Sequence, residues 1–455
     1  MARFYVSFCC ILLFCWSPSA AQHPGLVSGP WAGNIEMRTA SIWAEVKPSV
    51  RSVSVDYFPL GKPKEKKTVR YVGELGRDFN PVKFNLTYLQ FNTTYSYTLL
   101  IDGKEVKTAF PTQFTTKDLW QYRKPAPDFN FLAGSCAYFN EPEFDRPGKP
   151  YGYDSTIFAT MAKEDAAFHI WMGDNWYTRE ADYTSAWGMN YRASRDRSLP
   201  ILQPFMAKMP QYAIWDDHDF GPNDAGRNFL LRQESRDIFK QYSLQQAYGE
   251  NGEGIYSSFG WSDVDFFLTD DRYFRSHDDM PDSINGQPNS AKTFFGARQM
   301  DWLKNALLYS RATFKVIVVG SQVLNPLNRF ECFRHYPYEF NDLMQFLDSQ
   351  RINGVIFFTG DRHHSEVIGI PRPGQYPLYD VTISPYTAGI SKASGTETNN
   401  PFRMPNTLVE THNYGRISVS GPKGKREMKV EFIGLRGDKL GEWSVNEESL
   451  KKPAQ

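Results

Sequence analysis

The chain has 455 residues, of which 41% are hydrophobic and 15% are aromatic. That content is enough to bury a sizeable core, so the composition excludes a chain that is disordered throughout. The 51 basic residues balance the 51 acidic residues, which excludes the strong positive field of a general nucleic-acid-binding protein and an acidic tail. We expect one large domain and one smaller domain.

Residues 1–21 have the pattern of a secretory signal peptide. Arg3 supplies a positive charge, an apolar run extends from Val6 to Trp16, and small residues follow at 19–21. This run is too short to span a bilayer, which disfavours the alternative of a retained membrane anchor. No later apolar run reaches the length of about 18 residues that a span needs. We expect an exported protein, periplasmic or extracellular, without a transmembrane anchor after signal removal.

Two cysteines remain after the predicted signal peptide is removed, Cys136 and Cys332. A large exported chain with so few cysteines does not depend on a disulfide framework. One bridge between the two residues is the alternative. We expect two free thiols, with a functional role for Cys136 and none assigned to Cys332.

Residues 22–118 are predicted to form an all-β sandwich domain of immunoglobulin- or fibronectin-like type. Short alternating runs such as 40–46 are separated by turns rich in Pro, Gly and Lys, and the run 93–104 ends in an Asp-Gly hairpin signal. A segment of about 90 residues with these features favours a seven-stranded sandwich. Residues 119–127, which contain two prolines, are predicted to be a linker.

Residues 128–455 are predicted to form an α/β domain. Apolar strands end in polar or glycine-rich turns at 129–133, 168–172, 266–268, 314–319 and 355–359. Helical apolar spacing at 298–310 and 339–351 separates some of these strands, and the strands expected between 415 and 445 are predicted to complete the same sheet system. Sheets of this class bind ligands at the carboxyl ends of their strands, so we expect the functional site there.

The stretch 214–224 contains the densest group of ionisable residues at a predicted strand end. An apolar approach is followed by Asp216, Asp217, His218 and Asp219, and then by Asn223. Carboxylates packed together either repel one another or need a cation. Oxygen-rich clusters with one imidazole suit hard or borderline metal ions. The alternative for this stretch alone is a solvated turn with one Asp that caps a helix.

The other predicted strand ends supply donors of the same character. They are Cys136, Asp174, Tyr177, Asp270, Asp271, Asp361, His363 and His364. A thiolate and a phenolate are anionic donors that favour trivalent iron, whereas the amide oxygen of Asn223 suits calcium. Together these residues predict a multinuclear metal centre. His363 and His364 are adjacent and face opposite ways in an extended segment, so we expect one of them, His363, to be the ligand.

Each donor also has a structural alternative. Cys136 and Tyr177 could be core residues, and Asp270 and Asp271 could pair with Arg272.

The predicted metal centre would bind phosphoryl oxygens and lower the pKa of a water molecule.

Three residues beside the predicted metal centre are candidates for catalysis. Arg362 could bind phosphate through two parallel N–H groups. His218 could donate a proton to a leaving oxygen or stabilise developing charge, and Asp217 is a candidate both for catalysis and for metal binding.

The motif series as a whole resembles that of the PhoD-type alkaline phosphatases, a branch of the calcineurin-like metallophosphoesterases. The matching stretches are Gly134-Ser135-Cys136, Gly173-Asp174-x-x-Tyr177, Trp215-Asp216-Asp217-His218-Asp219, Asn223 and Gly360-Asp361-x-His363-His364. The resemblance covers roughly residues 25–450 of the chain. It implies a secreted hydrolase of phosphate monoesters, and often diesters, that holds one Fe3+ ion and Ca2+ ions.

The resemblance also implies roles for individual residues. Cys136, Asp174 and Tyr177 would bind iron, Asp174 and Asn223 would reach calcium, and Asp217 and Asp361 would be further ligands. Arg362 would contact phosphate. The chain departs from the family at Gly221-Pro222, where polar residues are usual, and this puts the position of Asn223 in doubt. Manganese or zinc stays open as a replacement for iron.

We therefore expect an alkaline phosphatase or phosphodiesterase that uses a metal-bound hydroxide and acts on a small-molecule or polymeric phosphoester, without specific nucleic-acid recognition. Phospholipids and teichoic-type polymers are alternative substrates. A serine hydrolase is disfavoured because the sequence has no Gly-x-Ser-x-Gly motif. A non-catalytic exported binding protein is the other alternative. Residues 175–199, which are rich in aromatic residues and Arg, are expected to form a specificity wall over the site.

Overall fold

The N-terminal part of the chain is built from strands. A computed structural model describes residues 23–453, so the predicted signal peptide lies outside the described residues. One sheet has the strand order β1-β2-β5, and the second has the order β4-β3-β6-β7, with β8 paired to β6. The bounds are β1 (Leu26–Gly33), β2 (Ala40–Val46), β3 (Val53–Pro59), β4 (Lys67–Arg70), β5 (Asn80–Leu86), β6 (Thr94–Ile101), β7 (Lys104–Glu105) and β8 (Gln113–Thr115).

The N-terminal part thus has eight strands, whereas the sequence analysis expected seven. Two of the eight, β7 and β8, are short, and both pair with β6. Alternate residues of β6 are buried, which is the pattern of a strand with one face toward a core. The predicted linker, 119–127, contains turns but no helix or strand. The domain boundaries themselves stay a prediction. Most buried residues of the N-terminal strands form a core of their own, but Trp31 and Trp43 belong to the core of the larger part.

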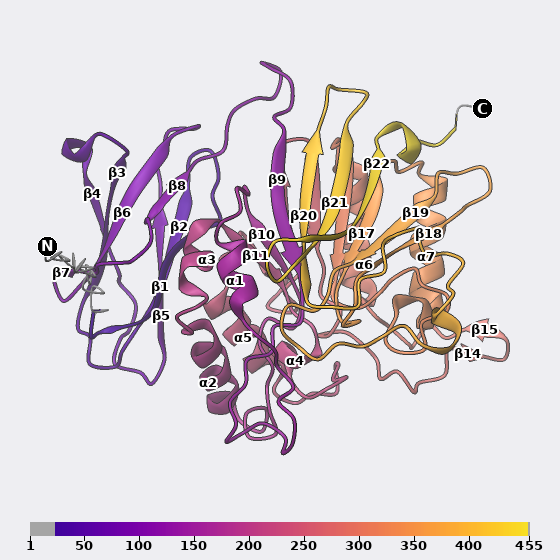
Figure 1. Ribbon diagram of the computed structural model, residues 1–455, viewed down its shortest axis with the longest axis horizontal. Coiled ribbons are helices and arrows are strands. Elements are labelled where there is room, and N and C mark those ends of the chain that lie inside the picture. Colours follow the sequence, from indigo (N-terminus) through magenta and orange to yellow (C-terminus); the bar gives the residue numbers. More distant parts are fainter. Residues whose placement is uncertain (1–22, 454–455) are drawn as a thin grey trace, which may run out of the picture.

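The larger part contains two six-stranded sheets (Figure 1). The first sheet has the order β11-β10-β9-β20-β21-β22, and the second has the order β12-β13-β16-β17-β19-β18. The strands of the first are β9 (Phe129–Gly134), β10 (His169–Met172), β11 (Gln211–Ile214), β20 (Asn413–Ser420), β21 (Glu427–Gly434) and β22 (Lys439–Asn446). Those of the second are β12 (Ser257–Trp261), β13 (Val264–Leu268), β16 (Phe314–Val319), β17 (Val355–Thr359), β18 (Glu366–Ile370) and β19 (Leu378–Thr382).

The C-terminal strands complete the first sheet, as the sequence predicted. Strands β9, β10 and β11 are parallel, and β20 joins β9 in antiparallel register. Strands β13, β16, β17 and β19 form a parallel set in the second sheet. Every residue of β16 and β17 is buried, which explains their continuous apolar sequence.

Helices surround the two sheets. They are α1 (Thr156–Met161), α2 (Ala186–Arg197), α3 (Gln203–Lys208), α4 (Asp217–Phe220), α5 (Arg232–Tyr242), α6 (Gly296–Tyr309) and α7 (Pro337–Ser349). Short 3-10 helices lie at Pro63–Glu65, Phe333–His335, Gly395–Glu397 and Glu448–Leu450, and β14 (Ser283–Ile284) pairs with β15 (Gln287–Pro288). In Figure 1, α1, α2 and α3 lie between the N-terminal strands and the first sheet, and α6 and α7 lie toward the other side. Among the described residues, we find no helix long and apolar enough to cross a membrane.

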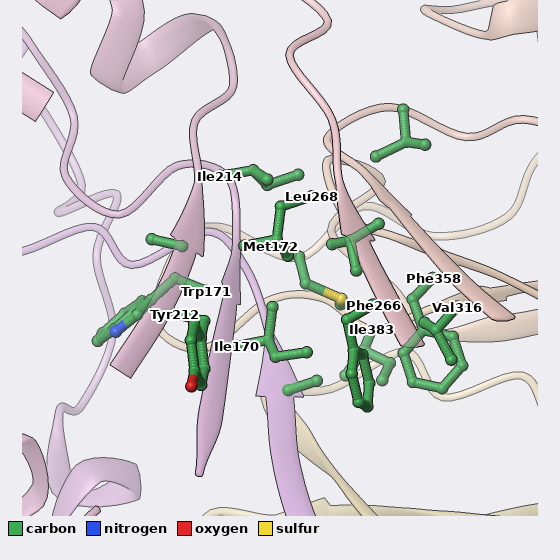
Figure 2. Close-up of a cluster of buried hydrophobic side chains, with 14 of the residues drawn as sticks. Ile170, Trp171, Met172, Tyr212, Ile214, Phe266, Leu268, Val316, Phe358 and Ile383 are labelled. Atoms are coloured by element: carbon green, nitrogen blue, oxygen red, sulfur yellow. The ribbon is translucent and has the colours of Figure 1, made fainter. Parts of the chain in front are cut away.

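The main core lies between the two sheets. Figure 2 shows Ile170 and Met172 of β10 and Ile214 of β11 on the side that faces Phe266, Leu268, Val316 and Phe358 of the second sheet. The ring centroid of Phe131, in β9, is 5.2 Å from that of Phe266 and 6.1 Å from that of Phe358. The carboxyl ends of β9, β10, β11 and β17 meet at one edge, since a Cβ at Gly360 would lie 2.6 Å from the Met172 carbonyl oxygen and 2.8 Å from Ser135, and a Cβ at Gly173 would lie 2.6 Å from Asp216.

Glu45 links the N-terminal strands to the helices of the larger part. It lies on β2, is 1% exposed, and accepts hydrogen bonds from the Ser194 hydroxyl at 2.8 Å and the Tyr242 hydroxyl at 2.9 Å. Burial raises the pKa of Glu45 from 4.5 to about 7 despite these two donors. Between these values the folded protein holds a proton that the unfolded chain releases, so this group lowers stability as the pH rises through that window.

Glu45→Gln is expected to raise the free energy of unfolding at pH 8 by roughly 1–3 kcal/mol and to change it little at pH 4.5, because glutamine keeps the acceptor oxygen and carries no charge. Urea denaturation of both proteins at the two pH values measures this difference. An equal effect at both pH values would contradict the assignment of the titration to Glu45.

Candidate metal centre

The predicted donors come together at the edge where β9, β10, β11 and β17 end. Cys136, Asp174 and Asp361 lie just beyond β9, β10 and β17, and Asp217 begins α4 after β11. Cys136, Asp174, Asp361 and His363 have φ angles of 62°, 53°, 64° and 57°. Left-handed backbone is uncommon for residues with a side chain, and such residues gather at sites where side-chain direction matters. The local backbone thus turns all four side chains into one region.

One donor group contains a thiol. The Cys136 sulfur, an Asp174 carboxylate oxygen and a ring nitrogen of His363 all lie within 4.8 Å of one another. The Tyr177 hydroxyl donates to Asp174 Oδ2 at 2.8 Å and lies 3.1 Å from His363 Nε2. Sulfur, phenol and carboxylate form the donor set that the sequence predicted for iron, the His363 imidazole lies beside them, and the chemistry of all four groups fits that ion.

A second donor group shares Asp174 with the first. Oxygens of Asp174 and Asp217 and a ring nitrogen of His218 lie within 4.8 Å of one another. The His218 backbone N–H donates to Asp174 Oδ1 at 3.3 Å, and the His218 ring stacks on Tyr177 with centroids 4.1 Å apart. Asp174 therefore stands where a carboxylate can bridge two ions.

The electrostatics of the site also fit cations. Burial, followed by the charges of Asp217, Asp219 and Asp361, raises the pKa of Asp174 well above its usual value. Burial and nearby carboxylates raise the pKa of Asp361 to about 7, and burial and Asp174 raise the pKa of Cys136. Anionic donors so close together repel each other, and a bound cation reverses that penalty.

Asp217 behaves differently. Its burial favours the neutral form, but His218 and Arg272 nearby hold its pKa below the usual value. Burial lowers the pKa of His218, although Asp217 opposes the shift. Each of the two neighbouring residues thus favours the charged form of the other.

A cavity of about 750 Å³ opens over these donors. Asp174, Asp217, His218, Asn223, Asp361, Arg362 and His363 all line it. Asn223 thus reaches the site despite the preceding Gly-Pro. Cys136 and Tyr177 lie beneath, both buried. The structure brings the predicted residues together, and their individual roles stay predictions.

Arg362 is held by protein groups. Its Nη1 donates to Asn328 Oδ1 at 2.6 Å, and its Nη2 donates to Glu397 Oε2 at 2.8 Å. Arg362 can therefore contact phosphate only while it keeps its hydrogen bonds to Asn328 and Glu397.

Of the two adjacent histidines, His363 enters the site, whereas His364 Nδ1 lies 3.1 Å from the Ser391 carbonyl oxygen. This arrangement agrees with the expectation that only one of the two is a ligand.

Asp270 and Asp271 do not line the cavity, and neither pairs with the guanidinium of Arg272. Asp270 accepts from Trp215 Nε1 at 2.8 Å, and Asp271 accepts from the Ser321 backbone N–H at 3.0 Å. Neither carboxylate belongs to a donor group among the described residues.

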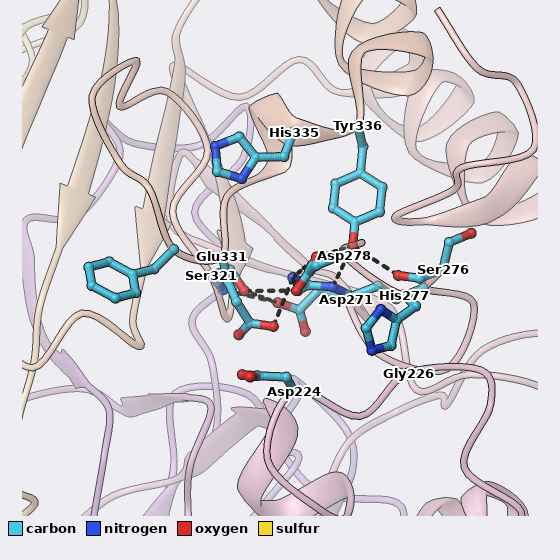
Figure 3. Close-up of polar contacts among 12 residues, drawn as sticks. Asp224, Gly226, Asp271, Ser276, His277, Asp278, Ser321, Glu331, His335 and Tyr336 are labelled. Atoms are coloured by element: carbon cyan, nitrogen blue, oxygen red, sulfur yellow. Dashed lines mark hydrogen bonds and ion pairs between the residues drawn. The ribbon is translucent and has the colours of Figure 1, made fainter. Parts of the chain in front are cut away.

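An arginine network supports one wall of the cavity. Arg272, which is 0% exposed, pairs with Asp216 and donates from Nη1 to Glu331 at 2.8 Å. Arg275 Nη2 forms ion pairs with Glu331 Oε1 at 2.8 Å and with Asp278 Oδ1 at 2.9 Å. Figure 3 shows Glu331 opposite Asp224 and the hydroxyl of Tyr336 directed at Asp278. Burial, Glu331 and Asp217 raise the pKa of Asp224 to about 6, so this wall also concentrates negative charge.

Sequence reasoning missed several residues that line the cavity: Tyr151, Asp224, Asp278, Lys292, Asn328 and Glu331. Asn328 and Glu331 lie after β16. The polar turn that follows this strand, at 320–322, is the sequence feature that could have pointed to them. Tyr151 and Lys292 lie in loops without a recognisable motif, and no sequence pattern points to them.

The expected specificity wall at 175–199 is wrong for most of its residues. Arg192 is fully buried and pairs with Asp182 at 2.8 Å, and the Arg197 guanidinium stacks 4.6 Å from the Trp171 ring centroid. Helix α2 packs against α5, which turns these side chains inward. Near the site, five residues from this stretch line a neighbouring cavity: Tyr177, Thr178, Arg179, Glu180 and Tyr183.

The fold is similar to that of two solved phosphatase structures. A solved structure of PhoD matches with a TM-score of 0.75 and 17% identity, over 94% of this chain and 91% of that chain. Purple acid phosphatase PPD1 from yellow lupin (Lupinus luteus) seeds matches with a TM-score of 0.63 and 12% identity, over 92% of this chain and 74% of that chain. These similarities confirm the α/β fold class, whereas the immunoglobulin-like type of the N-terminal part stays a prediction.

The family model described as PhoD-like phosphatase matches residues 131–400, and the chain belongs to this family. Alkaline phosphatase D of Bacillus subtilis (strain 168) is 25% identical over 289 residues. That alignment covers 53% of this chain and 48% of the relative, so the chain spans about half the length of this curated protein. The family resemblance predicted from the motifs is confirmed.

Proposed function

We propose that this protein is an exported, metal-dependent phosphoric ester hydrolase that acts as a phosphatase, a phosphodiesterase or both. The observation that supports this proposal most directly is the position of Asp174, whose carboxylate belongs both to the donor group with Cys136 and His363 and to the donor group with Asp217 and His218. One carboxylate between two donor groups is suited to a multinuclear centre. The pattern of residues 1–21 supports export.

Cys136, Asp174, Tyr177 and His363 would hold Fe3+, and Asp174, Asp217, Asn223 and Asp361 would hold Ca2+. When bound, such ions neutralise phosphoryl oxygens and make a water molecule more acidic. The remaining steps fall to the protein. The ring of His218, which lies at the cavity surface with Nε2 4.0 Å from Asp217 Oδ2, can donate a hydrogen bond to a departing oxygen.

The substrate that fits is a small-molecule or polymeric phosphoester, and phospholipid or teichoic-type polymers fit the same chemistry. The cavity lining is rich in carboxylates, so an anionic ester needs the metal ions to enter. Nothing in the balanced charge of the chain supports specific nucleic-acid recognition.

Purified protein with added calcium is expected to hydrolyse p-nitrophenyl phosphate, bis-p-nitrophenyl phosphate or both, and EDTA is expected to abolish the activity. A serine hydrolase would survive chelation, and a binding protein would turn over neither compound. Either result would contradict the proposal.

Cys136→Ser is expected to release iron, because a serine hydroxyl is a much weaker anionic donor than a thiolate. Elemental analysis and the visible absorption of protein purified without chelators measure the loss. Cys332→Ser is the matched control, since Cys332 is also a buried free thiol but lies beside Val323 and Asn325 carbonyl oxygens, outside the donor groups. Equal iron content in wild type and Cys136→Ser would remove Cys136 from the site.

A further inference from the structure

A second cavity adjoins the main one. Its volume is about 310 Å³, and it shares Tyr151, His218 and Asn223 with the cavity of about 750 Å³ over the metal donors. A phosphorus atom near these shared residues would therefore have two separate spaces beside it. A phosphate monoester has one organic substituent to place there, whereas a diester has two.

Four tyrosines line the second cavity, together with charged residues that include Asp145, Arg146, Lys149 and Glu180. Tyr138, Tyr151, Tyr177 and Tyr183 line it. The ring centroids of Tyr138 and Tyr151 are 4.9 Å apart, and those of Tyr138 and Tyr177 are 5.0 Å apart, both edge to face. His218 stacks on the Tyr177 ring and Arg179 lies over the Tyr138 ring, so a planar guest meets ring edges there and the rings of Tyr151 and Tyr183. We call this space the tyrosine cavity.

The protein holds this wall in place without a ligand. The Tyr138 hydroxyl donates to Asp145 at 2.8 Å, and Arg179 pairs with the same carboxylate at 2.9 Å while its guanidinium lies 4.1 Å from the Tyr138 ring centroid. A Cβ at Gly389 would lie 2.8 Å from the Tyr151 ring, so glycine leaves room for that ring. The Tyr151 hydroxyl is also 3.1 Å from His363 Nδ1. A preformed wall lowers the entropic penalty of binding a ring.

We propose that the tyrosine cavity receives a planar ring substituent of a phosphodiester while the other substituent occupies the main cavity. This inference rests on the proposed phosphoester hydrolysis and narrows its substrate class. Water forms a new bond to phosphorus, and the bond from phosphorus to one ester oxygen breaks with its electron pair staying on that oxygen. The departing oxygen takes a proton from the water, so the products are a phosphomonoester and an alcohol.

Tyr183 offers the cleanest test because it lines the tyrosine cavity and does not line the main one. Tyr183→Ala is expected to lower kcat/KM for bis-p-nitrophenyl phosphate about tenfold, the size of a lost aromatic contact. Hydrolysis of glycerol 2-phosphate, which has no ring, is expected to stay unchanged. Tyr183→Phe should restore the diester rate, and Tyr309→Ala, at an 88% exposed position on α6, serves as the control.

A second measurement does not require hydrolysis or a stable variant. Saturation-transfer NMR with neutral 4-nitrobenzyl alcohol is expected to show ring binding to the wild-type protein, and bis-p-nitrophenyl phosphate should displace the alcohol. No ring binding, together with an unchanged diester-to-monoester ratio in Tyr183→Ala, would overturn the inference while leaving phosphoester hydrolysis intact. Failure of the wild type to hydrolyse any of these esters would overturn the proposed function and this inference with it.

Discussion

Asp174→Asn is expected to lower kcat about a thousandfold, the loss of several kcal/mol of transition-state stabilisation. Asparagine has almost the same shape and can still accept from the Tyr177 hydroxyl, so the change removes charge with little change in packing. A neutral amide cannot bridge two cations as a carboxylate does, and both donor groups lose their shared anion. The measurement is kcat on p-nitrophenyl phosphate at saturating metal, with metal content determined on the same sample.

Asp301→Asn is the matched control, because Asp301 is an exposed carboxylate on α6. It should leave both kcat and metal content unchanged. If Asp174→Asn kept a rate within threefold of wild type, a bridging role for this residue would be untenable.

Arg272→Met is expected to lower the free energy of unfolding by about 3–5 kcal/mol, because it leaves buried carboxylates without their cation. Arg272 is fully buried and contacts both Asp216 and Glu331. Methionine fills much of the volume but donates no hydrogen bond. Urea denaturation measures the change, and a partly folded variant at neutral pH would be an extreme form of the same result.

Arg146→Met provides the contrast for that prediction. Arg146 pairs with Glu180 at 2.9 Å, but the two side chains are 86% and 57% exposed. An exposed pair contributes less than about 1 kcal/mol, so this variant should unfold almost like wild type. If the two arginine variants lost similar stability, burial of the Arg272 network would not be the cause.

The position of the site could be predicted because its residues directly follow apolar strands. Cys136, Asp174 and Asp361 are each two residues beyond the ends of β9, β10 and β17, and ligand sites of such sheets lie at the carboxyl ends of the strands. The roles of arginines could not be predicted in the same way. Arg192 and Arg197 look like surface residues in sequence, but carboxylate and aromatic partners from other segments bury them.

Loop residues account for the rest of what the sequence did not reveal. Glu331 reaches the cavity because Arg272 and Arg275 hold it there, a contact between segments about 60 residues apart. Tyr151 reaches it because Gly389 leaves space for its ring. Both depend on pairs of segments that no local pattern connects, and the count of N-terminal strands failed for a similar reason, since β7 and β8 are too short to show alternation.

Cys136, Asp174, Asp361 and His363 have left-handed backbone, which lowers the stability of the folded protein at positions that the metal site needs. Glycine adopts this conformation readily, whereas a residue with a Cβ resists it, so each of these side chains makes the folded state slightly harder to reach. Selection for thermal stability alone would therefore favour glycine at these positions, and the resulting protein would be more stable but would lack the side chains that the metal site needs. Screens that enrich thermostable versions of this chain need a simultaneous requirement for turnover.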